Sequence, residues 1–171
     1  MAPAPRQAPA THHYRVRCQW SGSTGAGYEG YSREHAAAAV PADASLRLSS
    51  DPAFRGDASL LNPEQLVVLA ASSCQLLSFL AVAARARLDV VDYDDEAEAV
   101  MPEDDPPARI TRIVLRPRIR VVDGPGVSQA RVQHLVEVAH RECFIANSLR
   151  SEIVVEPAIT IAPTSGAGSG T

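Results

Sequence analysis

The sequence predicts a single domain of the α+β class. Three features carry this prediction: a long apolar helix, two adjacent strand segments with complementary charges, and an amphipathic helix followed by a last strand. With 171 residues, of which 46% are hydrophobic and 21% charged, the chain can bury a core without a metal or disulfides. We expect the domain to span residues 11–162, between disordered tails at 1–10 and 163–171 that are rich in Ala, Pro, Gly and Ser.

Strand signals open the domain. Residues 13–20 alternate between two faces, and Cys18 shares a face with Val16 and Trp20, so we expect it to be a small core residue. After a run of turn-forming residues, the segments 28–40 and 45–48 are weaker strand candidates.

The long helix has a recognisable start. Asn62 suits an N-cap, Pro63 suits the first turn, and Gln65 stands at the third helical position of a capping box. Nearly every residue from 66 to 80 is apolar or small, and Cys74 is one of the few interruptions. This composition predicts a central helix that is covered on most sides.

Residues 89–101 and 109–122 predict two antiparallel strands joined by a turn at 102–107. An acidic row on the first strand can meet a basic row on the second. The acidic row is Asp94, Glu96 and Glu98; the basic row is Arg112, Arg116, Arg118 and Arg120, with Ile113, Leu115, Ile119 and Val121 on the opposite face. We interpret the basic row as the cross-strand partner of the acidic row rather than as a nucleic-acid surface.

A second helix is predicted to begin near Ser128. Its apolar stripe recurs at spacings of three and four and consists of Val132, Leu135, Val136 and Ala139. Cys143 extends this stripe and should face the core, because the eleven residues after Val132 make about three helical turns. We expect one last strand over residues 152–161.

The charge of the chain limits its partners. A net charge of −4 and a pI near 5.7 argue against nucleic acid and anionic membranes, which attract concentrated positive charge. No segment is expected to serve as a secretory signal or to reach the roughly 20 apolar residues of a membrane span. We therefore expect a cytoplasmic protein.

Three widely spaced cysteines fit redox or catalytic use in a reducing cytosol better than a structural disulfide framework. Cys74 and Cys143 both occupy predicted core-facing positions and could meet where the two helices pack, but the pattern leaves packing and chemistry both open. We expect no metal, because His140 and Cys143 form the only close His/Cys combination, and no cofactor, because the phosphate-binding and dinucleotide motifs are missing.

Two motifs on the predicted helices are more specific. Asn-Pro-Glu-Gln-Leu at 62–66 is followed by Ala-Ala-Ser-Ser-Cys at 70–74, and Ala-His-Arg-Glu-Cys stands at 139–143. They resemble the motifs of the osmotically inducible protein C and organic hydroperoxide resistance (OsmC/Ohr) family, and the segments 31–35 and 51–57 resemble its OsmC-like branch. The resemblance implies an OsmC/Ohr-like fold, with antiparallel strands packed around the long central helix and the second helix in an intertwined homodimer.

The resemblance also implies a thiol-dependent peroxidase that reduces organic hydroperoxides to alcohols. Cys74 would be oxidised to a sulfenic acid, and Cys143 would resolve it to a Cys74–Cys143 disulfide. An external dithiol, in this family often the lipoyl group of a lipoylated protein, would then reduce that disulfide.

A buried thiol needs help to ionise, so we expect a cation near Cys74. In the family an arginine held by a glutamate has this role. Glu64 matches the glutamate, Arg33 is the first choice for the arginine, and Arg55 is the second. Many members also have proline after the second cysteine, where this chain has Phe144.

The spacing of Glu64 and Cys74 bears on the oligomeric state. Ten residues of straight helix separate them by about 15 Å along the axis and about 80° around it. Either the helix is broken or two chains share each site, and we expect a homodimer. Two other functions stay open: a non-enzymatic dimeric binder of a hydrophobic small molecule, and a thiol redox sensor.

Overall fold

The computed structural model describes residues 10–163, so the predicted tails lie almost wholly outside the described residues. The chain divides into two compact units, residues 1–63 and residues 64–171, which are described separately. We refer to them as the N-terminal unit and the C-terminal unit.

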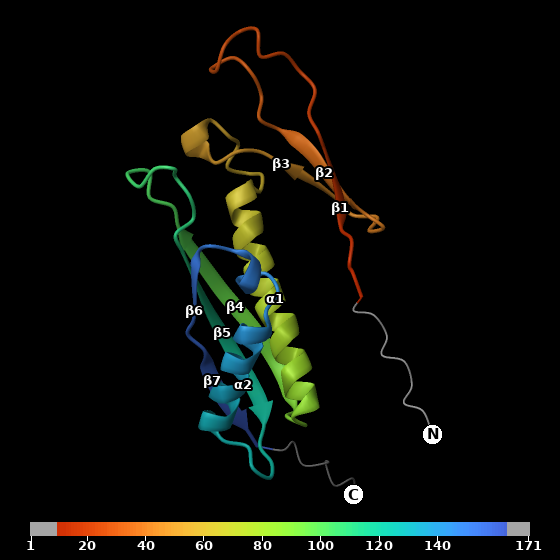
Figure 1. Ribbon diagram of the computed structural model, residues 1–171, viewed down its shortest axis with the longest axis vertical. Helices are drawn as coiled ribbons and strands as arrows, with labels where there is room; N and C mark the ends of the chain where they lie inside the picture. The colour runs from red at the N-terminus through yellow and green to blue at the C-terminus, as the bar shows by residue number, and fades with distance from the viewer. Residues whose placement is uncertain (1–9, 164–171) are drawn as a thin grey trace, which may run out of the picture. The chain divides into compact units, whose positions relative to one another are not determined.

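The N-terminal unit is a three-stranded antiparallel sheet (Figure 1). Its strands β1 (Arg15–Gln19), β2 (His35–Val40) and β3 (Ser45–Leu48) lie in chain order, and the short 3-10 helix η1 (Pro52–Phe54) follows. The three strand predictions are confirmed, although residues 28–34 form a loop rather than the start of the second strand.

The prediction that Cys18 belongs to the core is wrong. Cys18 is exposed, as is every residue of β1, and Val16 on the same face is 77% exposed. In the described part of the N-terminal unit the only helix before Pro63 is the three-residue η1, which is too short to cover a sheet. The alternation of residue types along β1 therefore predicted the strand, but it did not predict whether another element packs against the strand.

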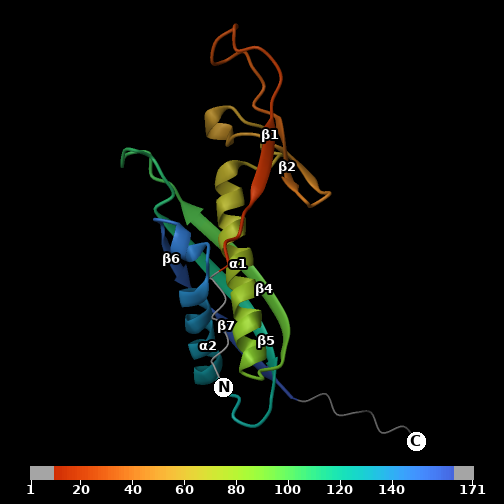
Figure 2. The same cartoon turned by 45° about the vertical axis from the view of Figure 1, so that its right-hand side comes forward.

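The C-terminal unit has two helices on one face of a mixed sheet (Figure 2). Its elements are α1 (Pro63–Arg85, whose first residue closes the N-terminal unit), β4 (Val90–Val100), β5 (Arg112–Val122), α2 (Gln129–Glu142), η2 (Ala146–Ser148), β6 (Glu152–Val155) and β7 (Ala158–Ala162). β4 pairs with β5 antiparallel, as predicted, and β6 and β7 both pair with β5 parallel.

The core lies between the two helices and β5. Phe79 of α1, Val136 of α2 and Ile119 of β5 belong to one cluster of buried side chains, so both helices cover the same face of the sheet. The side chain of Ser128 accepts a hydrogen bond from the backbone N–H of Arg131 and caps α2 at the predicted position.

The opposite face of β5 carries the predicted ion pairs. Arg116 pairs with Glu98, and Arg118 pairs with both Asp94 and Glu96 of β4. Arg112 pairs with Glu152 of β6 instead. These side chains are exposed, so each pair stabilises the sheet only modestly.

The prediction of one continuous last strand is wrong. β6 and β7 keep the same register against β5, since Leu115 opposes Val155 and Arg118 opposes Ala158. The strand is interrupted at Glu156 and Pro157, because proline has no N–H to donate to the ladder.

We expected the long helix to be covered on most sides, but within the single chain it is not. α1 buries one stripe that includes Ala71, Phe79 and Val82, whereas Leu69 and Leu77 are exposed. By length and composition alone α1 could cross a membrane, contrary to our expectation for the sequence. Its buried stripe nevertheless packs in the core of the C-terminal unit, as in the core helix of a soluble protein.

Phe79 tests this core. We predict that Phe79→Ala lowers the free energy of unfolding by about 3–5 kcal/mol, because Phe79 is 0% exposed and its removal leaves a cavity. Urea unfolding followed by circular dichroism measures the change. The matched control is Phe144→Ala at a side chain that is 80% exposed, for which we expect a change within about 0.5 kcal/mol. Equal losses in the two variants would contradict this packing.

Candidate functional site

The two helix cysteines meet at the contact between α1 and α2. Cys74 lies in the middle of α1 and is half-buried, and Cys143 is the C-cap of α2 and is 1% exposed. Next to Cys74, the side-chain amide of Gln75 is buried and donates to the backbone carbonyl of Val136, 3.4 Å away. The thiols of Cys74 and Cys143 lie close enough that each shifts the pKa of the other.

The turn that follows α2 directs backbone N–H groups at both sulfur atoms. The N–H of Ile145 donates to Cys74 Sγ and that of Ala146 donates to Cys143 Sγ, each over 3.5 Å. The N–H of Phe144 and the hydroxyl of Ser78 lie close enough to Cys74 to lower its pKa. The N–H of Ile145 acts on Cys143 as well, so the turn directs N–H groups at both sulfur atoms.

These contacts separate the two thiols in acidity. Burial raises the pKa of Cys74, but the hydrogen bonds from Ile145, Cys143, Phe144 and Ser78 lower it, and the net shift is downward. Burial and the neighbouring Cys74 sulfur raise the pKa of Cys143 to about 11. Cys74 is thus the thiol that loses its proton at the lower pH, and Cys143 keeps its proton to a higher pH.

The cation expected near Cys74 stays a prediction. The groups that lower the pKa of Cys74 in the described C-terminal unit are neutral N–H, O–H and S–H donors. Sequence reasoning missed them because a backbone N–H leaves no mark in residue composition. At residue 144, however, one signal was available: Phe144 retains the N–H that a proline lacks.

A second network fixes α1 on the sheet. Ser72, two residues before Cys74, donates its hydroxyl to Asp95 Oδ2 over 2.5 Å, and the backbone N–H of Arg116 donates to Asp95 Oδ1 over 2.7 Å. Sequence reasoning missed Asp95, although its position between the outward-facing Asp94 and Glu96 places it on the inner face of β4. Asp95 holds the helix that carries Cys74.

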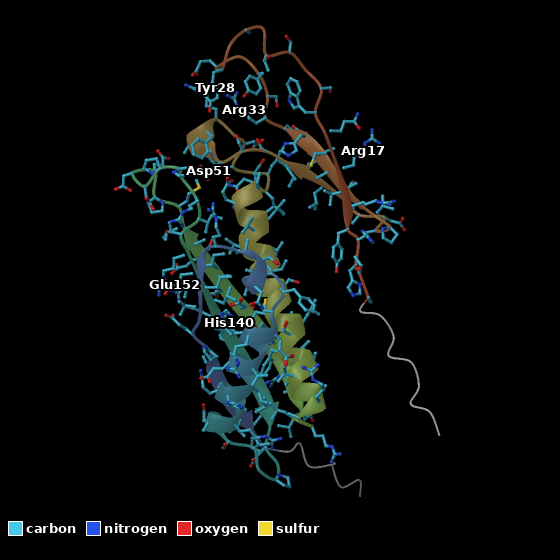
Figure 3. All side chains as sticks on the ribbon, viewed as in Figure 1. Arg17, Tyr28, Arg33, Asp51, His140 and Glu152 are labelled. Carbon is cyan, nitrogen blue, oxygen red and sulfur yellow. The ribbon has the colours of Figure 1, made fainter. Side chains whose placement is uncertain are left out.

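Both candidate arginines belong to the N-terminal unit, and each has partners there. The Arg33 guanidinium lies over the rings of Tyr28 and Tyr31, 4.6 and 3.9 Å from their centroids, and donates to the backbone carbonyls of both residues. Figure 3 labels Arg33 and Tyr28 in the same loop. Arg55, in the left-handed conformation at the end of η1, forms an ion pair with Glu29. Since the two units are described separately, an activating role for either arginine stays a prediction.

Glu64 lies in the first turn of α1, and the helix is unbroken from there to Cys74. Of our two explanations for their spacing, a broken helix is therefore wrong. On one continuous helix the two side chains stand about 15 Å apart along the axis, so Glu64 does not act directly on Cys74 of the same chain.

Three buried polar atoms have no hydrogen-bond partner among the described residues: Gln75 Oε1, Tyr93 Oη and His140 Nδ1. Burial lowers the pKa of His140 and raises that of Tyr93, so both are uncharged near pH 7. Among residues 10–163, no three His, Cys, Asp or Glu side chains are grouped as a metal would need.

A family model for OsmC-like proteins matches residues 56–158, which is more than half of the chain. The chain belongs to the OsmC-like protein family. The matched segment includes Glu64, Cys74 and Cys143, whereas Arg33 and Arg55 precede it. The recognition made from the sequence motifs is confirmed.

Solved structures of this family share the fold. An OsmC-like protein of unknown function from Vibrio cholerae is 26% identical, with a TM-score of 0.78 over 86% of this chain and 100% of that chain. An organic hydroperoxide resistance protein OsmC from Legionella pneumophila is 18% identical, with a TM-score of 0.65. The match covers 90% of this chain and 100% of that chain. Another organic hydroperoxide resistance protein, OhrB of Bacillus subtilis, is 16% identical, with a TM-score of 0.57. The match covers 87% of this chain and 98% of that chain. Comparison with curated proteins gave no match.

The difference in acidity predicts selective alkylation of this OsmC-like protein. We expect iodoacetamide to modify Cys74 with a lower pH midpoint than Cys143, because the pKa of Cys74 is lowered and that of Cys143 is raised to about 11. Peptide mass spectrometry across a pH series measures both midpoints, and the exposed Cys18 is the internal reference. The same midpoint at Cys74 and Cys143 would contradict the described hydrogen bonds.

Proposed function

We propose that this OsmC-like protein is a thiol-dependent peroxidase that reduces organic hydroperoxides to alcohols. The observation that carries the proposal is the adjacent pair of a half-exposed thiol with a lowered pKa, Cys74, and a buried thiol with a raised pKa, Cys143, each with a backbone N–H directed at its sulfur. A peroxidatic cysteine must be ionised and reachable, and a resolving cysteine must lie beside it and keep its proton until it is needed.

The reaction proceeds in three balanced steps. The Cys74 thiolate attacks the distal oxygen of the hydroperoxide, the O–O bond breaks, and the alkoxide takes up a proton to leave as an alcohol. The Cys74 sulfenic acid then condenses with the Cys143 thiol to give a disulfide and water. An external dithiol reduces this disulfide by exchange and leaves as its own disulfide, and a lipoylated protein has the required dithiol.

The active unit in this proposal is a homodimer. Exposed leucines on α1, among them Leu69 and Leu77, form an apolar face that a second chain could cover. Because Glu64 cannot reach Cys74 along its own helix, a second chain would bring Glu64 and Arg33, or alternatively Arg55, toward the site. We place the protein in the cytoplasm, where dithiol reductants are available.

A single turnover tests the activity. We expect one equivalent of cumene hydroperoxide to convert the reduced protein to a form that lacks two thiols and two hydrogens, because Cys74 and Cys143 become a disulfide. Intact mass and thiol counts follow the reaction, and dihydrolipoamide should restore the starting mass. Cys18→Ser is the control and should behave like wild type, since Cys18 is exposed on β1. Unchanged thiols at both helix cysteines would refute the proposal.

The dimer has its own test. We expect Leu77→Glu, at a side chain that is 64% exposed, to shift the sedimenting species from dimer toward monomer, because it puts a charge on the apolar face of α1. Val91→Glu on β4 replaces another exposed apolar side chain and should leave the dimer intact. Wild-type protein that sediments as a monomer would contradict the prediction.

A further inference from the structure

The carboxylate of Asp95 joins three elements of the C-terminal unit. Its Oδ2 accepts the hydroxyl of Ser72 from α1 over 2.5 Å, and its Oδ1 accepts the backbone N–H of Arg116 from β5 over 2.7 Å. Asp95 itself lies on β4. Each carboxylate oxygen thus binds a different neighbouring element, and the link to α1 is made two residues before Cys74.

Asp95 is held firmly on the side of the sheet. In the β4–β5 ladder it opposes Pro117, which has no N–H to donate. Pro117 is fully buried, and it lies in β5 between the residues that pair with the end of β6 and the start of β7. The bond between the Arg116 N–H and the Asp95 side chain therefore ties β4 to β5 beside this proline, and it orients the carboxylate toward α1.

Ser72 and Cys74 leave α1 on nearly opposite sides. Two residues of helix turn by about 200° and rise by about 3 Å, so when Ser72 points at β4, Cys74 points away from it. On that side the Cys74 Sγ accepts the N–H of Ile145, in the turn that follows Cys143. Because the helix is rigid over two residues, a rotation of α1 at Ser72 displaces the Cys74 sulfur from Cys143.

The other contacts of α1 constrain its rotation less. Its packing in the core is mostly apolar, and apolar burial has no preferred direction. Gln75 donates to the Val136 carbonyl over 3.4 Å, which is longer than the usual range of about 2.7–3.2 Å. The bond from Ser72 to Asp95 has the short length of a hydroxyl that donates to a carboxylate, which is a stronger class of hydrogen bond.

We propose that Asp95 is a positioning residue for the thiol pair: through Ser72 it sets the rotation of α1 that keeps Cys74 within reach of Cys143. Asp95 acts on the helix and not on the sulfur atoms. The consequence for peroxide reduction is a faster condensation of the Cys74 sulfenic acid with Cys143, and this consequence rests on the proposed function. The ease with which the two thiols form a disulfide with another oxidant does not.

The test is the equilibrium between the Cys74–Cys143 dithiol and its disulfide in mixtures of reduced and oxidised glutathione, with no peroxide present. One glutathione disulfide takes two electrons and two protons from the two protein thiols and leaves as two glutathione thiols. All proteins are full-length and carry Cys18→Ser, which removes the exposed third thiol. Peptide mass spectrometry measures the disulfide fraction, which gives the effective concentration of one thiol at the other.

We expect Ser72→Ala to lower this effective concentration about tenfold, because the bond that sets the rotation of α1 is lost. The matched control is Ser73→Ala, which makes the same change at the next, exposed residue and should have no effect. Ser72→Thr keeps the hydroxyl and should behave like wild type. Asp95→Asn should do so as well, because its amide oxygen accepts the Arg116 N–H and its amide nitrogen donates to Ser72.

Asp95→Ala should match Ser72→Ala, and the double variant should be no lower than the lower single variant, because all three lack the same link. An unchanged effective concentration in folded Ser72→Ala, or an equal loss in Ser73→Ala, would overturn the proposal. If Asp95→Ala does not fold, Ser72→Ala and its comparison with Ser72→Thr decide. Urea unfolding of the same variants separates the two roles, since a purely structural bond would change the free energy of unfolding and leave the glutathione equilibrium of the folded protein unchanged.

The outcome is separable from the peroxidase activity. A lowered effective concentration in Ser72→Ala of a protein that consumes no peroxide would support the role of Asp95 and refute the proposed function. Peroxide turnover in wild type, with the same effective concentration in wild type and Ser72→Ala, would do the reverse.

Discussion

The proximity of the thiols of Cys74 and Cys143 is the constraint on which the rest of the site depends. It exists because α1 and α2 lie over the same face of the sheet and share one core with β5. The Ser72–Asp95 bond fixes α1 on that sheet, and Gln75 binds the backbone of α2 beside the thiols. The fold therefore brings together two sulfur atoms that lie far apart in the sequence, and it does so with ordinary helix packing.

Two opposing physical effects then act on the pair. Burial disfavours the charged form of both thiols, and hydrogen bonds to sulfur favour it. The balance differs because Cys74 is half-buried and several donors lower its pKa, whereas Cys143 is buried and fewer donors lower its pKa. In the described C-terminal unit, backbone and side-chain donors together lower the pKa of Cys74, and all of them are uncharged. An arginine brought by a second chain would add to a difference that one chain already has.

The parts of this structure that could be predicted from sequence are those with a local signal. Apolar periodicity and capping residues identified α1 and α2, and complementary charges identified the β4–β5 pair, because each depends on neighbouring residues. The exposure of Cys18 and of the outer face of α1 depends on what packs against them, which periodicity does not encode. The N–H donor from Ile145 arises from the path of the backbone after α2, so only the structure could place it at Cys74. The partners of Arg33 were equally hidden, since two tyrosine carbonyls and rings in one loop leave no motif.

The central claim is that the two thiols have different roles because their surroundings differ, and sulfenic acid trapping tests it most directly. Each single variant, Cys74→Ser and Cys143→Ser, is treated with one equivalent of cumene hydroperoxide in the presence of dimedone and analysed by peptide mass spectrometry. The account predicts a dimedone adduct on Cys74 in the Cys143→Ser variant, and none on Cys143 in the Cys74→Ser variant, because only Cys74 is prepared to ionise. An adduct on Cys143, or equal labelling of the two cysteines, would contradict it.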